Sequence, residues 1–159
     1  MSKVLYLSYD GMTDPLGQSQ VVPYLLGLSR NGYRFTLISF EKEARYLVER
    51  DKIQKLLTSS KIQWIPLTYH KSPPVASTIF DLLRMRAKAK IMHQKESYDI
   101  VHCRSYLSAL VGIYLKRKYR IKFVFDMRGF WADERVEGRL WNLNNPVYRL
   151  VYRFFKRQE

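Results

Sequence analysis

Short apolar strands alternate with longer helical segments along the chain, and this alternation constrains the fold more than any other feature. Runs rich in β-branched and aromatic residues predict strands at residues 3–9, 33–40, 62–67, 99–103 and 121–127. Apolar residues at helical spacing predict a helix after each strand. Parallel strands need crossover connections of about a dozen residues or more, and these segments supply them. We therefore predict an α/β fold with an open, doubly wound parallel sheet of the Rossmann-like type.

Local signals mark several helix ends. Pro23 is expected in the first turn of the first helix, with Asn31 and Gly32 at its end. Asn145 suits the N-cap of a last helix that begins at Pro146. The segment 128–139, between the last strand and this helix, is expected to be a loop.

Composition excludes several classes of protein. The chain is 47% hydrophobic and 26% charged, as in ordinary globular domains. No apolar run approaches the roughly 18 residues of a membrane-spanning helix, and the N-terminal residues do not form a secretory signal, so we expect a cytoplasmic protein. A single cysteine, Cys103, permits no internal disulfide, and the histidines show no metal-ligand spacing, so no metal site is expected.

The net charge is the unusual property of this composition. Lys and Arg outnumber Asp and Glu by 28 to 14, giving +14, and most of the excess lies in residues 81–159. Such a charge favours an acidic partner: nucleic acid, an anionic membrane or a phosphorylated ligand. The third predicted helix is both basic and amphipathic. Its apolar stripe, opposite Arg84, Lys88 and Lys95, consists of Ile79, Phe80, Leu83, Ala87 and Ile91.

A glycine-bearing loop joins the first strand to the first helix, where phosphate groups often bind. Gln18 stands where a P-loop has lysine, and only Gly17 of a three-glycine dinucleotide fingerprint is present. We therefore expect no bound nucleotide cofactor. Two interpretations remain open: Gly17 only forms the turn, or Gly17, Gln18 and Ser19 line a ligand pocket with backbone donors.

Two further strand ends carry charged residues, and ligands bind at the carboxyl ends of strands in this type of sheet. Arg104 ends the fourth strand, where its guanidinium suits a phosphate or carboxylate. His102 is interpreted as a buried core residue.

The segment after the fifth strand is the densest polar cluster. Asp126, Arg128 and Glu134 are suited to act as a base, an anion-binding group and a hydroxyl acceptor. Trp131 is suited to stack on a sugar or a base. The alternative interpretation is a salt-bridged surface loop.

Four segments together resemble the N-terminal domain of family 4 glycosyltransferases, which have the GT-B fold. They are residues 3–8 (KVLYLS), 14–20 (DPLGQSQ), 99–104 (DIVHCR) and 126–134 (DMRGFWADE). The resemblance covers essentially the whole chain. It implies that residues 1–159 are the acceptor-side half of a GT-B architecture, truncated before a C-terminal donor domain.

The resemblance also implies roles for single residues. Gly17 matches the family's glycine-bearing loop, and His102 matches the first histidine of a frequent H-x-H strand end, where Arg104 replaces the second. The segment from Asp126 matches a D-x-R-x-x-W-x-x-E variant, with Gly129 where relatives often have aspartate. The candidate catalytic residues are Arg104 and Asp126. The candidate substrate-binding residues are Gly17, Gln18, Ser19, Arg128, Trp131 and Glu134.

The function that the resemblance implies is acceptor binding in a retaining, metal-independent glycosyltransferase. The nucleotide-sugar donor is bound by the missing domain, so this chain alone is expected to be inactive. The acceptor is expected to be a lipid-linked sugar or a polysaccharide. Basic faces on the third helix and at Arg149, Arg153, Lys156 and Arg157 suit an anionic membrane, and hence a peripheral place on the inner face of the cell membrane.

Two alternatives remain. One is a non-catalytic membrane-docking subunit of a two-chain glycosyltransferase, which predicts a native end at Glu159. The last helix runs to Glu159 without a glycine or capping residue, which favours a trimmed chain instead. The other is a basic nucleic-acid-binding module, against which no RRM, KH or helix-turn-helix pattern is found.

Overall fold

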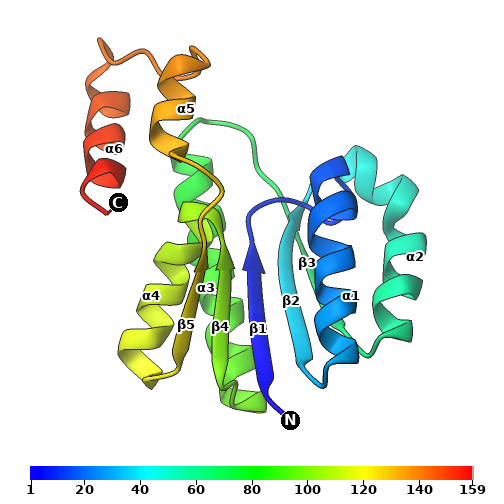
Figure 1. The fold of residues 1–159 in the computed structure, drawn as a ribbon. Helices are drawn as coiled ribbons and strands as arrows, with labels where there is room; N and C mark the ends of the chain where they lie inside the picture. The colour runs from blue at the N-terminus through cyan, green and yellow to red at the C-terminus, as the bar shows by residue number, and fades with distance from the viewer. Residues whose placement is uncertain (159) are drawn as a thin grey trace. The chain divides into compact units, whose positions relative to one another are not determined.

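A parallel sheet of five strands forms the centre of the fold in the computed structural model, which describes residues 1–158 (Figure 1). The strands are β1 (Lys3–Ser8), β2 (Arg34–Glu41), β3 (Gln63–Thr68), β4 (Ile100–Arg104) and β5 (Lys122–Asp126). Their order in the sheet is β3-β2-β1-β4-β5, so the winding reverses at β1. This confirms the predicted open, doubly wound α/β sheet.

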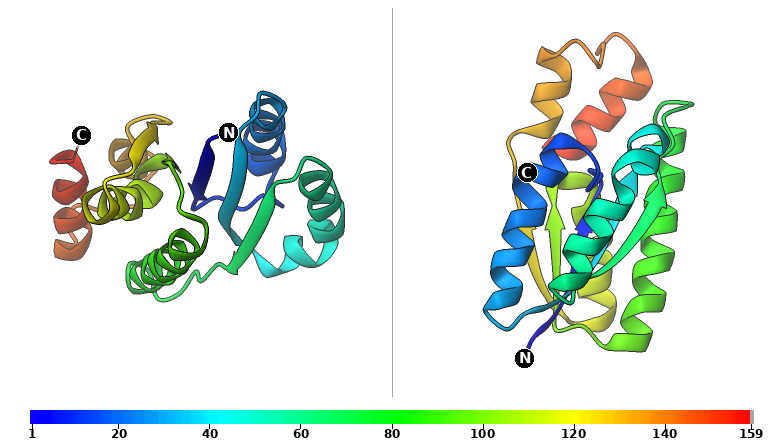
Figure 2. Two further views of the ribbon diagram at one scale, coloured as in Figure 1. Left: turned by 90° about the horizontal axis from the view of Figure 1, so that it is seen from below. Right: turned by 90° about the vertical axis from the view of Figure 1, so that its right-hand side faces the viewer.

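Helices connect all successive strands. They are the π-helical turn η1 (Gly17–Val21) with α1 (Val22–Arg30), then α2 (Glu43–Ser59), α3 (Ala76–Glu96) and α4 (Ser105–Tyr119), followed after β5 by α5 (Trp131–Glu137) and α6 (Pro146–Lys156). Seen from below, α1 and α2 lie on one side of the sheet and α3 and α4 on the other (Figure 2). Such coverage requires strands that are apolar on both faces, as the sequence predicts.

Successive residues of β1 supply two separate cores, because side chains alternate between the faces of a strand. Val4 and Tyr6 pack with α1 and α2 on one face. Leu5 and Leu7 pack with α3 and α4 on the other. The two buried clusters hold β1 between them and fix the position of its carboxyl end.

The predicted helix signals occupy their expected positions. Pro23 lies in the first turn of α1, and Asn31 is its C-cap. The Asn145 side chain accepts a 2.9 Å hydrogen bond from the backbone N–H of Val147, at the start of α6. Local capping chemistry therefore determines these ends as predicted.

The expected loop at 128–139 is wrong, because α5 forms within it. Only Ala132 of this helix is buried, so the segment has almost no apolar periodicity to read. Asp133 and Glu134 lie in its first turn, where they interact favourably with the helix dipole. Local electrostatics thus favour a helix that the hydrophobic pattern does not show.

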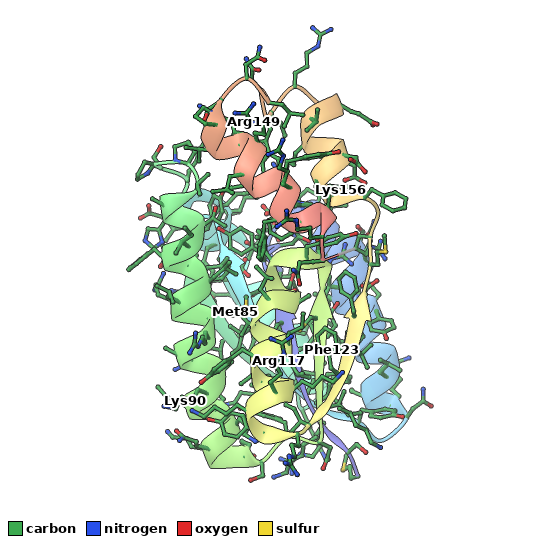
Figure 3. All side chains as sticks on the ribbon, turned by 90° about the vertical axis from the view of Figure 1, so that its left-hand side faces the viewer. Met85, Lys90, Arg117, Phe123, Arg149 and Lys156 are labelled. Carbon is green, nitrogen blue, oxygen red and sulfur yellow. The ribbon has the colours of Figure 1, made fainter. Side chains whose placement is uncertain are left out.

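The apolar stripe of α3 faces away from the core. Ile79, Leu83 and Ile91 are 54%, 56% and 47% exposed. The face that packs on the sheet includes Met85, Ala89 and the carboxylate of Asp81. Figure 3 shows this side of the sheet, with Lys90 on α3, Arg117 on α4 and the buried Met85.

Contacts divide the chain into two compact units, residues 1–125 and residues 126–159. The first contains the sheet up to Phe125 with α1 to α4, and the second contains α5 and α6. The expected single domain over residues 1–159 stays a prediction. Among residues 1–158, no helix is both long and apolar enough to cross a membrane.

Close packing between β4 and α4 seals the single cysteine. Cys103 is fully buried, and a Cβ added to Gly112 of α4 would lie 2.3 Å from its sulfur. Burial raises the pKa of the Cys103 thiol far above its ordinary value. The thiol is therefore a packed core group in the folded chain.

Candidate functional site

The carboxyl ends of β1 and β4 lie side by side, because Ser8 pairs with Arg104 in the sheet. Arg104 is only 5% exposed. Its Nε donates to Asp10 at 3.1 Å, and a terminal nitrogen donates to the Gln20 side chain at 2.7 Å. The sheet thus brings Arg104 against the segment that follows β1, where its guanidinium is held in one orientation.

Glu41, at the end of β2, organises the loop after β1 from within. Its buried carboxylate accepts hydrogen bonds from the backbone N–H groups of Met12 and Thr13 at 2.8 and 3.0 Å. The hydroxyls of Thr13 and Ser39 donate to it at 2.6 Å each. Two backbone donors of the loop are therefore already bonded to a carboxylate of the chain itself, in the place where phosphate-binding loops receive an anion.

Gly17 is required by packing. A Cβ at this position would lie 2.1 Å from the carbonyl oxygen of Gly11 and 2.7 Å from Cα of Met12. Because Gly17 has no side chain, the first residue of η1 packs directly against the backbone of Gly11 and Met12. π-Helical turns are rare in proteins, and those that occur are often found at functional sites.

Gln18 and Ser19 donate to nearby backbone carbonyls, and Gln18 Oε1 also accepts a 3.4 Å hydrogen bond from Lys52 of α2. Gln18 donates from its side chain to the carbonyl of Thr13 at 3.1 Å, and the Ser19 hydroxyl donates to the carbonyl of Pro15 at 2.7 Å. Ser19 is exposed and Gln18 is half-buried. Their role in ligand binding stays a prediction, and so does that of Gly17.

In the second unit, the residues predicted after β5 form a small charged group. Arg128 lies 3.7 Å from Asp126 in an ion pair. Gly129 has a φ of +137°, and a Cβ there would lie 2.2 Å from Oε1 of Glu134. Glycine therefore permits the close approach of the Glu134 carboxylate to the backbone.

Trp131 belongs to the aromatic cluster of this unit. Its ring contacts Trp141 and Phe155 at centroid distances of 5.2 and 4.9 Å, and Arg135 lies over it. The neighbouring Asp133 accepts hydrogen bonds from Lys156 at 2.9 Å and Tyr152 at 2.8 Å. The bonds from Lys156 and Tyr152 lower the pKa of Asp133. The cluster joins α5 to α6, and whether Trp131 also stacks on a sugar stays a prediction.

His102 lies in the core, 7% exposed, between the rings of Tyr6 and Tyr24 at 4.7 and 5.8 Å. Within the part of the chain that the structure describes, no group of three or more His, Cys, Asp or Glu side chains is arranged to hold a metal ion.

Two buried carboxylates are absent from the sequence predictions. Glu41 ends a strand that is buried from Phe35 onward, and Asp81 stands at a helical position whose neighbours one turn away are buried. The signal that both share is an acidic residue at a position where the surrounding residues of the same element are buried in the core. Asp81 holds the imidazole of His70, which follows β3.

Comparisons with known proteins relate this chain to glycosyltransferases. The model of Glycosyltransferase Family 4 matches residues 18–158. The glycotransferase of kitacinnamycin has a similar fold, with a TM-score of 0.55, 12% identity, and coverage of 77% of this chain and 29% of that one. A glycosyltransferase from Rickettsia africae gives a TM-score of 0.51 and 18% identity, with coverage of 84% and 33%.

The C-terminal domain of a hydrogenase from Pyrococcus furiosus also has this fold, with a TM-score of 0.58, 15% identity, and coverage of 79% of this chain and 91% of that one. At such identities the structural likeness shows the fold alone. A search of curated proteins finds no match. The chain spans about a third of the two glycosyltransferase structures, as their coverage of 29% and 33% states.

Proposed function

Because the chain belongs to glycosyltransferase family 4, we propose that it is the acceptor-binding half of an enzyme that transfers a sugar from a nucleotide-sugar to a lipid-linked or polysaccharide acceptor. The observation that carries the proposal is the family match over residues 18–158 on a chain that spans about a third of related enzymes.

The hydrogen bonds of the loop after β1 support the proposal that the nucleotide-sugar binds to a separate donor domain and not to this loop. Glu41 already bonds the N–H groups of Met12 and Thr13, so a diphosphate would have to displace a buried carboxylate to use them. A second anion beside Glu41 would also be repelled. We therefore assign the nucleotide-sugar to a C-terminal domain, and sugar transfer by this chain alone is expected to be absent.

Transfer is proposed to be retaining and independent of a metal ion. Catalysis would then rest on positioning the acceptor and on neutralising the diphosphate leaving group. Arg104, fixed by Asp10 and Gln20, supplies a rigid positive charge at the carboxyl edge of the sheet. Asp126 with Arg128 is the proposed acceptor contact in the second unit.

Docking on an anionic membrane is proposed from the outer faces of two helices. On α3 the exposed stripe of Ile79, Leu83 and Ile91 lies opposite the packed face, among basic residues of the same helix. On α6, Leu150 and Phe154 are 70% and 44% exposed. The basic residues of α6 that accompany them are Arg149, Arg153 and Lys156, of which Arg149 and Lys156 are labelled in Figure 3. Exposed apolar side chains beside cations suit a lipid headgroup surface, and we place the protein on the inner face of the cell membrane.

Sugar transfer is tested directly with radiolabelled nucleotide-sugars and lipid-linked acceptors. The purified 159-residue chain is expected to show no turnover, and the full-length product of its gene is expected to transfer the sugar without added divalent cation. Multiple turnovers by the chain alone would refute the assignment of the donor to another domain.

Membrane docking is tested by flotation with vesicles of phosphatidylcholine containing phosphatidylglycerol. The variant Leu83→Ser/Ile91→Ser is expected to bind about tenfold more weakly, because apolar area no longer enters the bilayer surface. The matched control is Leu47→Ser/Val48→Ser on α2, whose side chains are 69% and 78% exposed. Equal losses in both variants would show that α3 has no special role.

A further inference from the structure

A buried carboxylate of α3 fixes an imidazole at the carboxyl edge of the sheet. Asp81 is 0% exposed. One of its oxygens lies 2.6 Å from Nδ1 of His70, and the other accepts a 3.0 Å hydrogen bond from the backbone N–H of the same residue. The hydroxyl of Tyr9 donates to Asp81 at 3.3 Å. His70 is thus held at two points, in the turn that follows β3.

The contact determines which ring nitrogen carries the proton. A carboxylate only accepts, so Nδ1 of His70 donates to Asp81 and the proton of the neutral ring lies there. Nε2 is then left with its lone pair. Among residues 1–158, no group bonds to Nε2, and the side chain is 39% exposed. The structure therefore presents an oriented hydrogen-bond acceptor to solvent.

An exposed aromatic ring stands beside this acceptor. The ring of Phe80 meets the ring of His70 edge to face, with centroids 5.3 Å apart, and Phe80 is 52% exposed. Arg84 lies over Phe80 at 5.7 Å and is bonded to the carbonyl of Thr68 at the end of β3. The ring of Phe80 therefore offers exposed apolar area, and contacts with His70 and Arg84 of the same unit hold it in place.

A flat apolar ring beside a fixed polar group suits a carbohydrate. One face of a pyranose carries mostly C–H groups, and its rim carries hydroxyls. Sites for such ligands combine apolar surface with a small number of placed polar groups. His70 also follows a strand of the sheet whose carboxyl edge carries Arg104, which is the edge where ligands bind in this fold.

We propose that His70 and Phe80 form a subsite for one sugar unit of the acceptor. The ring of Phe80 packs against the C–H face of the sugar, and Nε2 of His70 accepts a hydrogen bond from one of its hydroxyls. Asp81 is a positioning residue, because it acts only through the imidazole. This inference rests on the proposed acceptor-binding function and names a place where that function is carried out.

The test uses NMR of the imidazole nitrogens in the purified 159-residue chain at alkaline pH. His70 is expected to carry its proton on Nδ1. His93 provides an internal reference, since its Nδ1 accepts from the backbone N–H of Tyr98 at 3.3 Å and its proton lies on Nε2. A His70 ring protonated on Nε2 would overturn the proposal, because the acceptor atom would be absent.

Binding is then measured by adding methyl glycosides of glucose, mannose, galactose and N-acetylglucosamine, each up to about 100 mM, a range suited to weak ligands. At least one glycoside is expected to shift the Nε2 signal of His70 saturably. Phe80→Ser and His70→Ala are expected to weaken its affinity about fivefold, the effect of one lost contact. The matched control is Gln94→Ser, a change to another exposed residue of α3, and it is expected to leave affinity unchanged.

The outcomes separate this inference from the proposed function. Shifts confined to amides around Arg104, with His70 unaffected, would overturn the subsite and leave the acceptor-binding function standing. No shift anywhere with any glycoside would overturn both. An equal loss of affinity in Gln94→Ser would overturn the role of Phe80, because a general effect on α3 would then explain the result.

Discussion

The loop after β1 and the turn after β3 are each held by a buried carboxylate, Glu41 of β2 and Asp81 of α3, but the two carboxylates have different kinds of partner. Glu41 is bonded to backbone N–H groups and hydroxyls that lie inside the loop. Asp81 is bonded to His70, whose ring has a second nitrogen that reaches solvent. Glu41 therefore stabilises the conformation of the loop, whereas Asp81 orients His70 so that its Nε2 can accept a hydrogen bond from a ligand.

This difference shows what separates a structural charge from a candidate ligand site. Burial and hydrogen bonding are similar for both carboxylates, so neither property identifies the role. The distinguishing feature is whether the partner has another polar atom available on the outside. The following predictions test this contrast, beginning with the closed loop.

Glu41→Ala is expected to have the largest effect. It leaves buried donors of Met12, Thr13 and Ser39 without their acceptor, and it should lower the free energy of unfolding by about 3–5 kcal/mol. Urea unfolding followed by circular dichroism measures the change. The control is Glu49→Ala on α2, which loses only an exposed pair with Lys52 and should change stability by less than about 0.5 kcal/mol. Equal effects would mean that the loop does not depend on Glu41.

Gly17→Ala is expected to come second. Its new Cβ would overlap the backbone of Gly11 and Met12, and backbone cannot move aside as a flexible side chain can. We expect a loss of about 3 kcal/mol. Gly27→Ala in α1 is the matched control, since a Cβ there meets nothing within 4 Å. The control should raise stability by about 0.5–1 kcal/mol, because alanine favours helix over glycine. Thermal unfolding of the two variants should therefore shift in opposite directions.

Arg104→Met is expected to reduce stability by about 2 kcal/mol, because two charge-assisted hydrogen bonds are lost. Arg104→Lys keeps the charge but not the forked geometry and should recover less than half of this loss. Chemical unfolding of both variants gives the comparison. Full recovery by lysine would indicate that charge alone matters at this position, and that Asp10 and Gln20 do not fix its orientation.

His93 is expected to give the smallest effect, and it sharpens the contrast with His70. Burial lowers the pKa of His93 below its ordinary value, so the folded chain binds a proton there less readily than the unfolded chain. This contribution to stability is present in full above about pH 6.5 and is lost as pH falls from there through the folded pKa. His93→Gln should flatten the pH dependence of unfolding in that range. An unchanged slope would show that the ring is not desolvated.

The sequence allowed the sheet and its connections to be predicted because both depend on local patterns. Apolar runs of strand length and helical periodicity are properties of neighbouring residues. The same holds for Pro23 and Asn145, whose effects arise within one turn of helix. The parallel arrangement was predicted because each connection is long enough to be helical, whereas the strand order β3-β2-β1-β4-β5 was not predicted.

The packed face of α3 could not be predicted in this way. Its sequence contains two apolar lines, one through Ile79 and Leu83 and one through Met85 and Ala89. Both have helical spacing, and only the second meets the sheet. The core-facing line even includes the charged Asp81, which is acceptable because His70 and Tyr9 satisfy it. Those partners are distant in sequence, and no local pattern announces them.

The candidate site shows the same limit. Arg104 was predicted at a strand end, and its contacts with Asp10 and Gln20 arise only when β1 and β4 pair. Glu41 was missed because it lies just beyond the strand predicted at residues 33–40 and finds its donors in a loop about 28 residues earlier. Long-range hydrogen bonds determine what a charged residue does, and a single sequence does not contain them.

The tight contact between Gly112 and Cys103 has a practical consequence. Since this is the single cysteine of the chain and its sulfur is sealed beneath α4, an alkylating reagent reaches it only when that region opens. The rate at which Cys103 is alkylated therefore measures how often this region opens. Alkylation of Cys103 can therefore report conformational opening in each variant described above without an engineered cysteine.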